Sequence, residues 1–585
     1  MKPGGTAKLF RPGGIASGTF FLGEHSTKGT KAMEFINMTI GEWMDKIADE
    51  NPDQPAVIFT HDFDYKRTYR EFNDEAHTIA KAFMAMGIKK GDHVAIWATN
   101  YPQWQLTLFA CAKIGAVLVT VNTGYKIHEA EYLLKQSDTK LLVMCDGFKD
   151  TSYVDIMNRL CPGLETGDRA DICSKRLPVL KKIVTIDEEA HPGTYNWKEL
   201  YAMADQISDE EYAEARKGLD PHDVINMQYT SGTTGFPKGV MLTHYNILNN
   251  GKTIGDRMKF TKEDRLCITV PLYHCFGLVL ATMASITHAS TMVPVKYYSP
   301  IKVLEALQSA KCTALHGVPT MFIAMLEHPR FSEFKFCLRT GIMAGSPCPI
   351  KVMQQVVDDM GMKEITIVYG QTEASPGCTQ TTTDDSLERR VSTVGRAFPG
   401  VETKIVDPET GETLGPGQVG EFCARGYNVM KGYYKMPEAT AQAIDKEGWL
   451  HTGDLATVDA EGYYKITGRI KDMIIRGGEN IYPKEIEDFI YTHPKVSDVQ
   501  VVGVPSKAYG EEIMAFVIPK EGEELTEKEI KDYVLASMAK HKVPSFVSFI
   551  KEFPMNGAGK ILKYKLREMA IEEKDLHDAA AIETA

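Results

Sequence analysis

The feature that most constrains the fold is an alternation, between about residues 65 and 145, of short apolar runs with segments of helical periodicity. Three runs are typical of buried strands: HVAIW at 93–97, AVLVTV at 116–121 and KLLVMC at 140–145. Before them, one face of a predicted helix carries Phe72, Ala76, Ile79, Ala80 and Phe83. Such alternation favours parallel sheets covered by helices. The sequence therefore predicts an α/β fold.

The chain has 585 residues, too many for one hydrophobic core, so two or more domains are expected. Between 400 and 470, glycines, short strand-like runs and turn dipeptides such as Asp407-Pro408 predict a β-rich subdomain. After Arg469 a compact α+β unit begins, with predicted strands VQVVGV at 499–504 and IMAFVI at 513–518. Two apolar sets mark its helices: Ile486, Phe489 and Ile490, then Ile530, Tyr533, Val534 and Met538.

We therefore expect a flexible extension over 1–35, a large N-terminal domain of stacked, helix-covered sheets over 36–470, and a small mobile α+β domain over 471–585. The first 23 residues lack acidic side chains and carry Lys2, Lys8 and Arg11, as a transit peptide does. They are also rich in glycine and lack a continuous apolar run, which favours a disordered start.

Composition excludes several classes of function. A formal net charge of −12 argues against nucleic acid as a partner. Eleven cysteines, none in a C-x-x-C pair, indicate a reducing compartment rather than disulfides or a zinc cluster, and the sixteen histidines show no metal-ligand spacing. No apolar stretch is long enough to span a bilayer. These features predict a cytoplasmic protein, and they leave its oligomeric state open, with a homodimer among the options.

The segment 224–243 carries the clearest chemistry. Two predicted strands, VINMQYT and GVMLTH, flank the loop SGTTGFPK. Its glycines let backbone N–H groups approach a polyphosphate, and Lys238 adds a positive charge. Hydroxyls come from Thr230, Ser231, Thr233 and Thr234, with Gly232 among them. The spacing is not that of a Walker A loop, and we expect a strand, not a helix, to follow.

Together with four later segments, this loop resembles the signature of the adenylate-forming superfamily of acyl-CoA synthetases, amino-acid adenylation domains and firefly-type luciferases. The later segments are YGQTEASP at 369–376, HTGDL at 451–455, GRIKDMIIRGGENIYPKEIE at 468–487 and NGAGKILKYKLRE at 556–568. The resemblance runs in order from about residue 40 to 570. It implies an enzyme that uses ATP and Mg²⁺ to activate a carboxylic acid.

The resemblance assigns the nucleotide site residue by residue. It implies that the Tyr369 ring lies on adenine with its hydroxyl free, that Asp454 accepts both ribose hydroxyls, and that Thr372 bonds the α-phosphate. Glu373 and Thr230 are the implied Mg²⁺ ligands, because hard oxygen donors suit that ion. The rest of the implied nucleotide set is Gly345, Ser346, Gly370, Gln371, Ile466 and Arg469.

The resemblance also implies moving parts. Lys471 occupies the hinge position, and Lys560 is the lysine that reaches the acyl carboxylate and the α-phosphate. Lys563 and Lys565 nearby are expected to face solvent. In the second half-reaction, the segment Arg476, Gly477, Gly478 and Glu479 is implied to line a coenzyme A tunnel.

The acyl pocket is placed by family position. His274 is the implied gate or, as the alternative, a hydrogen-bonded core histidine. The implied lining is Tyr273, His274, Cys275, Phe276, Gly277, His316, Gly317, Val318 and Met321. Apart from the histidines these are apolar or uncharged, which suits an uncharged acyl group, and the run MIIRGGENIYPKEIEDF looks most like medium-chain fatty acyl-CoA synthetases. We expect a fatty or cyclic carboxylate of short to medium length with coenzyme A as acceptor. The alternatives are a ligase that loads a carrier protein, a luciferase-like oxygenase, and a non-catalytic nucleotide-binding relative.

Overall fold

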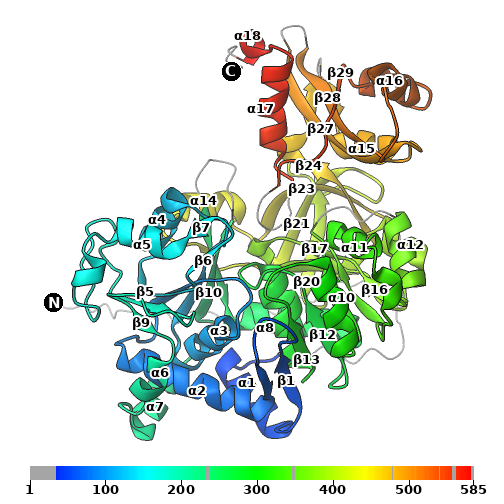
Figure 1. Ribbon diagram of the computed structural model, residues 1–585. Coiled ribbons are helices and arrows are strands. Elements are labelled where there is room, and N and C mark those ends of the chain that lie inside the picture. Colours follow the sequence, from blue (N-terminus) through cyan, green and yellow to red (C-terminus); the bar gives the residue numbers. More distant parts are fainter. Residues whose placement is uncertain are drawn as a thin grey trace, which may run out of the picture. The chain divides into compact units, whose positions relative to one another are not determined.

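The structure is a computed structural model that describes residues 34–230, 237–345, 350–476, 479–506, 509–538, 540–555 and 561–580. Figure 1 shows the course of the chain and the labelled elements. The predicted extension over 1–35 lies outside the described residues except for its last two.

The predicted alternation builds an eight-stranded sheet in the order β22-β11-β10-β4-β3-β5-β8-β9. Its central strands run parallel, and β10 and β11 form an antiparallel hairpin at one side. The three strands expected first are present as β3, β4 and β5. The bounds are β3 (His93–Trp97), β4 (Val117–Thr120), β5 (Thr139–Met144), β8 (Lys182–Thr185), β9 (Tyr195–Asn196), β10 (Val224–Thr230), β11 (Lys238–Thr243) and β22 (Gly432–Tyr433).

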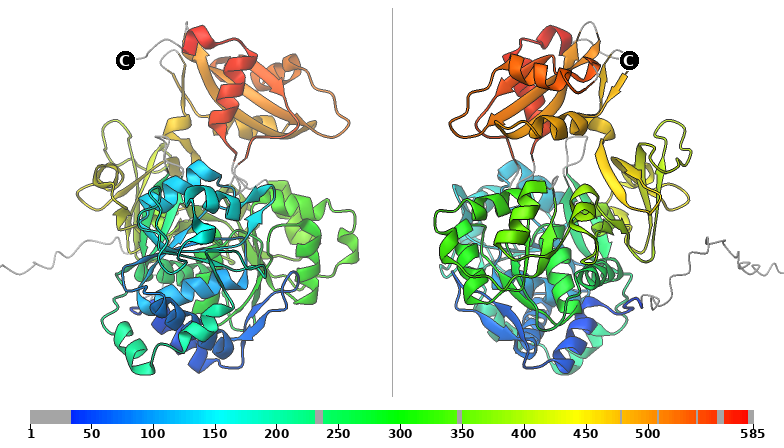
Figure 2. Two further views of the ribbon diagram at one scale, coloured as in Figure 1. Left: turned by 60° about the vertical axis from the view of Figure 1, so that its left-hand side comes forward. Right: turned by 90° about the vertical axis from the view of Figure 1, so that its right-hand side faces the viewer.

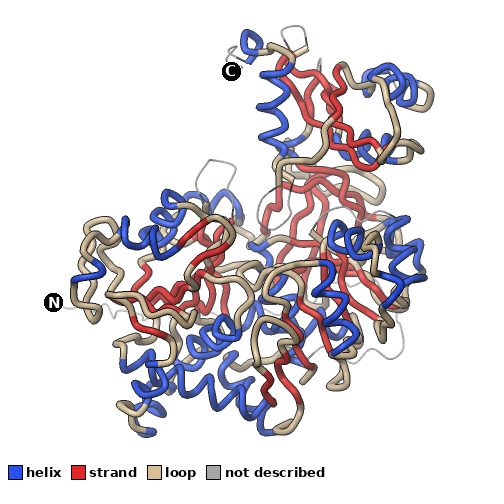
Figure 3. The backbone as a smooth tube through the Cα atoms, in the orientation of Figure 1, coloured by secondary structure: helices blue, strands red, loops and turns tan. Residues whose placement is uncertain are grey.

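A second, seven-stranded sheet has the order β16-β15-β14-β12-β13-β1-β2, parallel except for β2. Figure 3 shows the strands of both sheets in red with helices in blue beside them. The bounds are β1 (Pro55–Ile58), β2 (Lys66–Thr68), β12 (Arg265–Ile268), β13 (Thr291–Pro294), β14 (Ala314–Gly317), β15 (Thr340–Met343) and β16 (Glu364–Thr366).

Two helical segments connect the sheets. Helix α8 packs on β10 and β11 of the first sheet, η2 packs on β12 of the second, and α8 and η2 pack on each other. One core cluster therefore continues from sheet to sheet. The helices of this part are α1 (Ile40–Glu50), α2 (Tyr69–Ala85), α3 (Pro102–Ile114), α4 (Ile127–Gln136), α5 (Tyr153–Leu160), α6 (Glu199–Ala204), α7 (Asp209–Arg216), α8 (His244–Arg257), η2 (Phe276–Met283), α9 (Ala284–Thr287), α10 (Pro300–Ser309), α11 (Pro319–Leu326) and α12 (Ile350–Asp359).

Local sequence explains where these helices begin and end. Thr39 caps α1 in a capping box with Glu42, and Thr68 caps α2 in the same way with Glu71. The apolar run at 108–121 is divided because Gly115, with φ 69°, ends α3 before β4 begins. The five apolar residues predicted on one face of α2 are all fully buried. No helix among the described residues is long and apolar enough to cross a membrane.

The β-rich segment predicted over 400–470 is present as a four-stranded antiparallel sheet in the order β20-β21-β23-β24. A three-stranded sheet, β17-β18-β19, precedes it in the chain and was not predicted. Their bounds are β17 (Val368–Gly370), β18 (Gly377–Gln380), β19 (Arg396–Ala397), β20 (Val401–Val406), β21 (Gly420–Gly426), β23 (Leu450–Val458) and β24 (Tyr464–Arg469). The short elements of this part are η4 (Thr372–Ala374), α13 (Leu387–Ser392) and α14 (Pro437–Ala443).

The C-terminal part has a sheet and apolar clusters of its own, which Figure 2 shows in orange and red. The expected strands are present, but one helix is shorter than predicted. Helix α16 ends at Leu535, so Met538 lies beyond it in a turn and packs against the cluster from there. The bounds are η5 (Ile470–Asp472), β25 (Ile474–Arg476), β26 (Glu479–Ile481), α15 (Pro483–Tyr491), β27 (Val496–Ser506), β28 (Gly510–Pro519), α16 (Glu527–Leu535), β29 (Phe546–Phe549), α17 (Lys563–Glu573) and α18 (His577–Ala580).

Candidate active site

The hairpin of β10 and β11 holds the two ends of the glycine-rich loop together. Thr230, the last residue of β10, is the direct cross-strand partner of Lys238, the first residue of β11. A strand therefore follows the loop, as predicted. Ser231, Gly232, Thr233 and Thr234 lie outside the described residues. The structure thus fixes the two anchors of the predicted phosphate loop.

Glu373 lies at the centre of a polar cluster. Its carboxylate oxygen Oε1 accepts a hydrogen bond from the Tyr433 hydroxyl at 2.8 Å and another from the Thr230 hydroxyl at 3.4 Å. The ammonium group of Lys238 lies 4.9 Å from the centre of the Tyr433 ring. Burial of Tyr433, with the Glu373 charge beside it, raises the pKa of its hydroxyl, which stays protonated and donates. The two predicted metal ligands, Thr230 and Glu373, therefore meet.

Tyr369 and Asp454 form a second polar contact. The Tyr369 hydroxyl donates to Asp454 Oδ2 at 2.9 Å, and Arg469 Nε lies 2.9 Å from Asp454 Oδ1. The hydroxyl is therefore not free, contrary to our expectation. Burial raises the pKa of the Tyr369 hydroxyl, and the nearby Asp454 charge raises it further because it also opposes ionisation. The arrangement presents an apolar ring and a fixed carboxylate side by side.

Two residues of strand β21, which pairs with β23, contact the segments that carry Tyr369 and Asp454. The Phe422 ring meets the Tyr369 ring edge to face, with centroids 5.1 Å apart. Just before Asp454, within the irregular part of β23, Gly453 has φ 69°, a conformation that favours glycine. Its N–H donates to Glu421 Oε1 at 2.9 Å. Neither Phe422 nor Glu421 was predicted, and no local sequence signal marks them, because their role depends on strand pairing.

The remaining predicted nucleotide residues lie on strands or just after them. Gly370 ends β17, and a Cβ atom there would come within 1.8 Å of the Pro376 carbonyl oxygen, so only glycine fits. The N–H of Gln371 donates to that same carbonyl. Gly345 follows β15, Ile466 lies half-buried on β24, and Ser346 falls outside the described residues.

The predicted acyl segment contacts the segment that is predicted to bind the α-phosphate. Cys275 Sγ lies 3.8 Å from the Thr372 hydroxyl and 3.6 Å from His274 Nδ1. Tyr273 and Phe276 belong to the large core cluster, with Val318 and Met321 packed against it. Gly277 lies within the same buried segment, whereas the His274 side chain is exposed. The chain thus joins an apolar region directly to the residue implied to bind the α-phosphate.

His316 is a fully hydrogen-bonded core residue. Its Nδ1 accepts from the N–H of Ile342 at 3.2 Å, and its Nε2 donates to the carbonyl of Leu280 in η2 at 3.0 Å. Burial lowers the pKa of His316 to about 4, so the ring is neutral at pH 7. The ring also packs against Phe276, with centroids 5.9 Å apart. Gly317 follows it at the end of β14. No described member of the predicted lining therefore adds a buried charge.

The residues implied to move are only partly described. Lys471 is exposed in η5, and Lys560, Gly477 and Gly478 lie outside the described residues, as does the Glu479 side chain. The Arg476 guanidinium lies against Glu512 and donates to the His541 carbonyl at 3.0 Å.

One expectation about the neighbours of Lys560 is wrong. The Lys563 ammonium does not simply face solvent, because it lies 2.6 Å from Glu487 and donates to the Val501 carbonyl at 3.0 Å. Lys565 is exposed, as expected.

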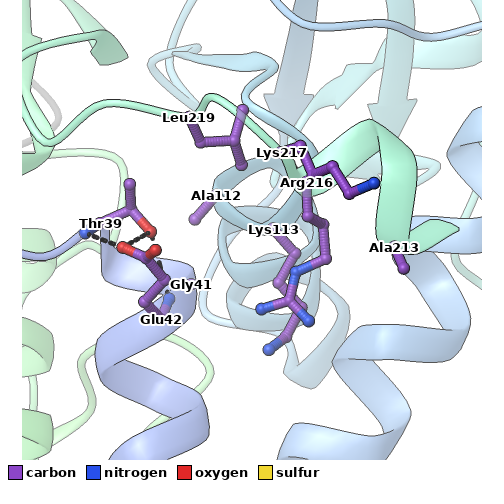
Figure 4. Close-up of a pocket in the computed structure, with 9 residues that line it drawn as sticks. All are labelled: Thr39, Gly41, Glu42, Ala112, Lys113, Ala213, Arg216, Lys217 and Leu219. Carbon is purple, nitrogen blue, oxygen red and sulfur yellow. Dashed lines mark hydrogen bonds between the residues drawn. The ribbon is translucent and has the colours of Figure 1, made fainter.

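A separate cavity of about 210 Å³ lies among α1, α3 and α7, and it touches none of the predicted site residues. Figure 4 shows Thr39 and Glu42 bonded to each other on one side, with Lys113 and Arg216 on the other. Both cations lie against the single carboxylate of Asp45, which offsets part of their charge. The cavity is also smaller than usual ligand sites of about 300–1,000 Å³. We assign this cavity no part in the chemistry.

Comparison with known proteins places this geometry in a family. Residues 44–434 match the AMP-binding enzyme family, and residues 485–560 match the AMP-binding enzyme C-terminal domain. The chain is 52% identical over 540 residues to "Putative acyl-CoA synthetase YngI" of Bacillus subtilis (strain 168), covering 92% of this chain and 98% of that protein. It is 40% identical over 552 residues to the mitochondrial medium-chain acyl-CoA ligase ACSF2 of Bos taurus, covering 92% and 89%.

Solved structures agree with these matches. ATP-bound MatB from Rhodopseudomonas palustris has a TM-score of 0.78 at 30% identity, covering 91% of this chain and 99% of that one. The o-succinylbenzoate CoA synthetase MenE from Bacillus subtilis, in complex with its acyl-adenylate intermediate, has a TM-score of 0.72 at 26% identity, covering 90% and 97%. Because the family models match both its large and its C-terminal parts and a 52% identical relative covers 92% of it, the chain belongs to the AMP-binding enzymes, the adenylate-forming superfamily.

Proposed function

We propose that the protein is an ATP-dependent acyl-CoA synthetase. It activates a fatty or cyclic carboxylic acid of short to medium length as an acyl-adenylate, releasing pyrophosphate, and then transfers the acyl group to coenzyme A, releasing AMP. The relatives named acyl-CoA synthetase and medium-chain acyl-CoA ligase support this activity.

The observation that carries the proposal is the contact between Cys275 and Thr372. On one side of it lies the apolar segment proposed for the acyl chain, and on the other lies Glu373, next to Thr372 in η4 and bonded to Thr230. An acyl carboxylate at this junction would therefore stand at the α-phosphate of a nucleotide held by Tyr369 and Asp454. Placing two reacting groups together is a large part of catalysis when neither needs a base.

The donor set fits the two charged cofactors of the reaction. A hydroxyl at Thr230 and a carboxylate at Glu373 are hard oxygen ligands of the kind Mg²⁺ binds. When bound, the ion offsets phosphate charge. Lys238 lies at the loop beside them and suits the β- and γ-phosphates. Asp454, already fixed by Tyr369 and Arg469, has lone pairs left to accept ribose hydroxyls.

In the proposed first step, a carboxylate oxygen of the acid forms a bond to the α-phosphorus as the bond to the pyrophosphate oxygen breaks. The carboxylate is already anionic, so it needs no general base. Lys560 is proposed to stabilise the charge that builds up on the α-phosphate and the acyl oxygen. In the second step the thiol sulfur attacks the acyl carbon, AMP leaves, and the thiol proton is released.

The second step is proposed to use the C-terminal domain in a different orientation. We place the domain boundary between 470 and 471 and the hinge at Lys471, which is exposed in the short element η5. The segment 476–479 would then line the coenzyme A tunnel. Since Glu512 and the His541 carbonyl already hold Arg476, we propose that this side chain shapes the tunnel wall.

We propose a cytoplasmic location, supported by ten described cysteines that are all free.

The test is a pyrophosphate-release panel with acids from acetate to palmitate, benzoate and cyclohexane carboxylate, each with and without coenzyme A. We expect release with medium-length or cyclic acids and thioester only when coenzyme A is present. Thioester on a carrier protein but not on coenzyme A would favour the carrier-loading alternative, and oxygen-dependent light would favour the luciferase-like one. If none of the acids caused pyrophosphate release, the non-catalytic alternative would be favoured.

A further inference from the structure

A mixed set of metal-binding side chains lies on the β21–β23 pair, outside the residues proposed for catalysis. Glu421 and Cys423 are two positions apart on β21 and so share one face of the strand. His451 on β23 is the direct cross-strand partner of Cys423. His451 Nδ1 lies 2.8 Å from Glu421 Oε2 and 3.5 Å from Cys423 Sγ. One ligand atom of each residue lies within 4.8 Å of the others.

From these contacts we infer that Glu421, Cys423 and His451 form a binding site for a divalent transition-metal ion such as Zn²⁺. The donors are one oxygen, one sulfur and one imidazole nitrogen, a combination typical of zinc rather than of Mg²⁺. Three protein ligands leave the fourth tetrahedral position for water. The thiol proton is displaced when the ion binds.

The spacing of the ligand atoms supports the assignment. With Zn–N near 2.0 Å and Zn–S near 2.3 Å, tetrahedral geometry requires an N···S separation of about 3.5 Å. His451 and Cys423 already have that separation. The matching N···O separation is about 3.3 Å, so the 2.8 Å contact between His451 and Glu421 must open by about half an ångström.

The surroundings orient the histidine. The other ring nitrogen, His451 Nε2, lies 3.6 Å from Asp445 Oδ2, so Nδ1 can face the ion while Nε2–H faces a carboxylate. Metal-bound histidines commonly have such a partner. The Cys423 thiol is buried beside Trp449, whereas about a third of the His451 side chain is exposed and offers an approach.

The site is connected to the nucleotide contacts through Glu421. Its second oxygen, Oε1, accepts the N–H of Gly453, the residue before Asp454. The β21–β23 pairing is irregular at this point, between Glu421 and Cys423. A shift of Glu421 on metal binding would therefore move the segment of β23 that carries Gly453 and Asp454. We expect the bound ion to weaken ATP binding without occupying the ATP site.

Cobalt alone, added to the full chain without ATP or Mg²⁺, tests the site independently of activity. We expect one equivalent to give thiolate-to-cobalt charge-transfer absorption, and Zn²⁺ to abolish it. The variants Cys423→Ser and His451→Gln should lose the band. Cys378→Ser, which removes another buried thiol, and His191→Gln, which removes a donor from a second carboxylate–histidine group, should keep it.

Absence of the band from the wild-type chain, or its persistence in Cys423→Ser, would overturn the proposal and leave a hydrogen-bonded cluster only. Far-UV circular dichroism of each variant separates loss of the site from loss of the fold. In a second measurement, Zn²⁺ should raise the KM for ATP several-fold in the wild type and not in Cys423→Ser. An equal effect on both would refute the coupling to Asp454.

Discussion

Tyr369 and Asp454 lie 85 positions apart in the chain, yet the hydroxyl of one donates to the carboxylate of the other across 2.9 Å. The contact joins β17 to β23 and fixes an aromatic ring beside an anionic group. Because Arg469 holds the other carboxylate oxygen, Asp454 is oriented before any nucleotide arrives. A prepared site of this kind loses less freedom on binding.

Tyr369→Phe should raise the KM for ATP about tenfold, because a hydrogen bond to a charged group contributes about 1.5–3 kcal/mol. The kcat should change less, since the ring remains for adenine. Steady-state kinetics with ATP as the varied substrate measure both.

Tyr464→Phe is the matched control. Tyr464 packs on the same Phe422 ring at 5.0 Å, but its hydroxyl bonds to Thr403 instead of Asp454. Equal effects of the two substitutions would mean that the Tyr369 hydroxyl acts only through packing.

Glu373→Gln should lower kcat about a hundredfold, the scale of losing one charge-stabilising group at a reacting centre. It should also raise the Mg²⁺ concentration needed for half-maximal rate, because an amide is a weaker ligand for a hard cation. Titrating Mg²⁺ at fixed ATP measures the shift. Glu388→Gln, on the exposed surface of α13, should behave as the wild type. An unchanged Mg²⁺ requirement in Glu373→Gln would remove this residue from the metal site.

Much of this site could be predicted because its residues stand in ordered local motifs. Thr230 and Lys238 flank a loop between two strand patterns, and the structure pairs them directly. Tyr433 could not be found in this way, because it contacts Glu373 from a two-residue strand 60 positions later. Glu421 and Phe422 were missed for the same reason. A residue that acts through strand register leaves no signal in its own neighbourhood.

For the fold, too, some features could be predicted from local sequence and others could not. Runs such as HVAIW fixed strands to within a residue, because a buried parallel strand requires an unbroken apolar run. The end of α16 was misplaced because Met538 keeps the helical spacing and still packs on the core after the helix has stopped. Apolar periodicity reports burial, and burial does not require the helix to continue.

The unfolding free energy should fall as the pH drops below neutrality, partly through His316. Burial lowers its pKa from 6.5 to about 4, so the folded protein binds fewer protons than the unfolded chain between these values. Above about pH 6.5 the neutral His316 ring leaves the unfolding free energy at its full value. Between pH 6.5 and pH 4 the unfolding free energy falls progressively, by about 3 kcal/mol for this residue.

Urea unfolding at a series of pH values measures the slope. His316→Asn should be less stable at neutral pH and should show a smaller loss on acidification. His577→Gln, at an exposed position, should keep the wild-type slope. A wild-type slope in His316→Asn would show that other groups, including buried His244, account for the acid sensitivity.

Asp45→Asn should cost about 3–5 kcal/mol, because it leaves a buried cation without its counter-charge. Lys113 is fully buried and lies 2.7 Å from Asp45, at the wall of the cavity in Figure 4. Burial lowers the pKa of Lys113 to about 8 even with Asp45 present. The double variant Asp45→Asn/Lys113→Met should be more stable than Asp45→Asn alone, since it removes the stranded charge. Thermal unfolding of both variants tests this, and additive losses would contradict it.

Lys560→Ala should abolish formation of the acyl-adenylate while leaving thioester formation from supplied acyl-AMP nearly intact. The reason is the proposed division of labour, in which Lys560 stabilises charge only while the α-phosphate is attacked. Pyrophosphate release measures the first half-reaction, and coenzyme A consumption with synthetic acyl-AMP measures the second.

Lys565→Ala is the matched control, because that lysine is exposed on α17 and should affect neither half-reaction. Lys563→Ala is less suitable as a control. It would leave the largely buried Glu487 carboxylate without its 2.6 Å ion pair and should lower stability instead. If Lys560→Ala slowed both half-reactions equally, one orientation of the C-terminal domain would have to serve both steps, and the hinge at Lys471 would lose its purpose.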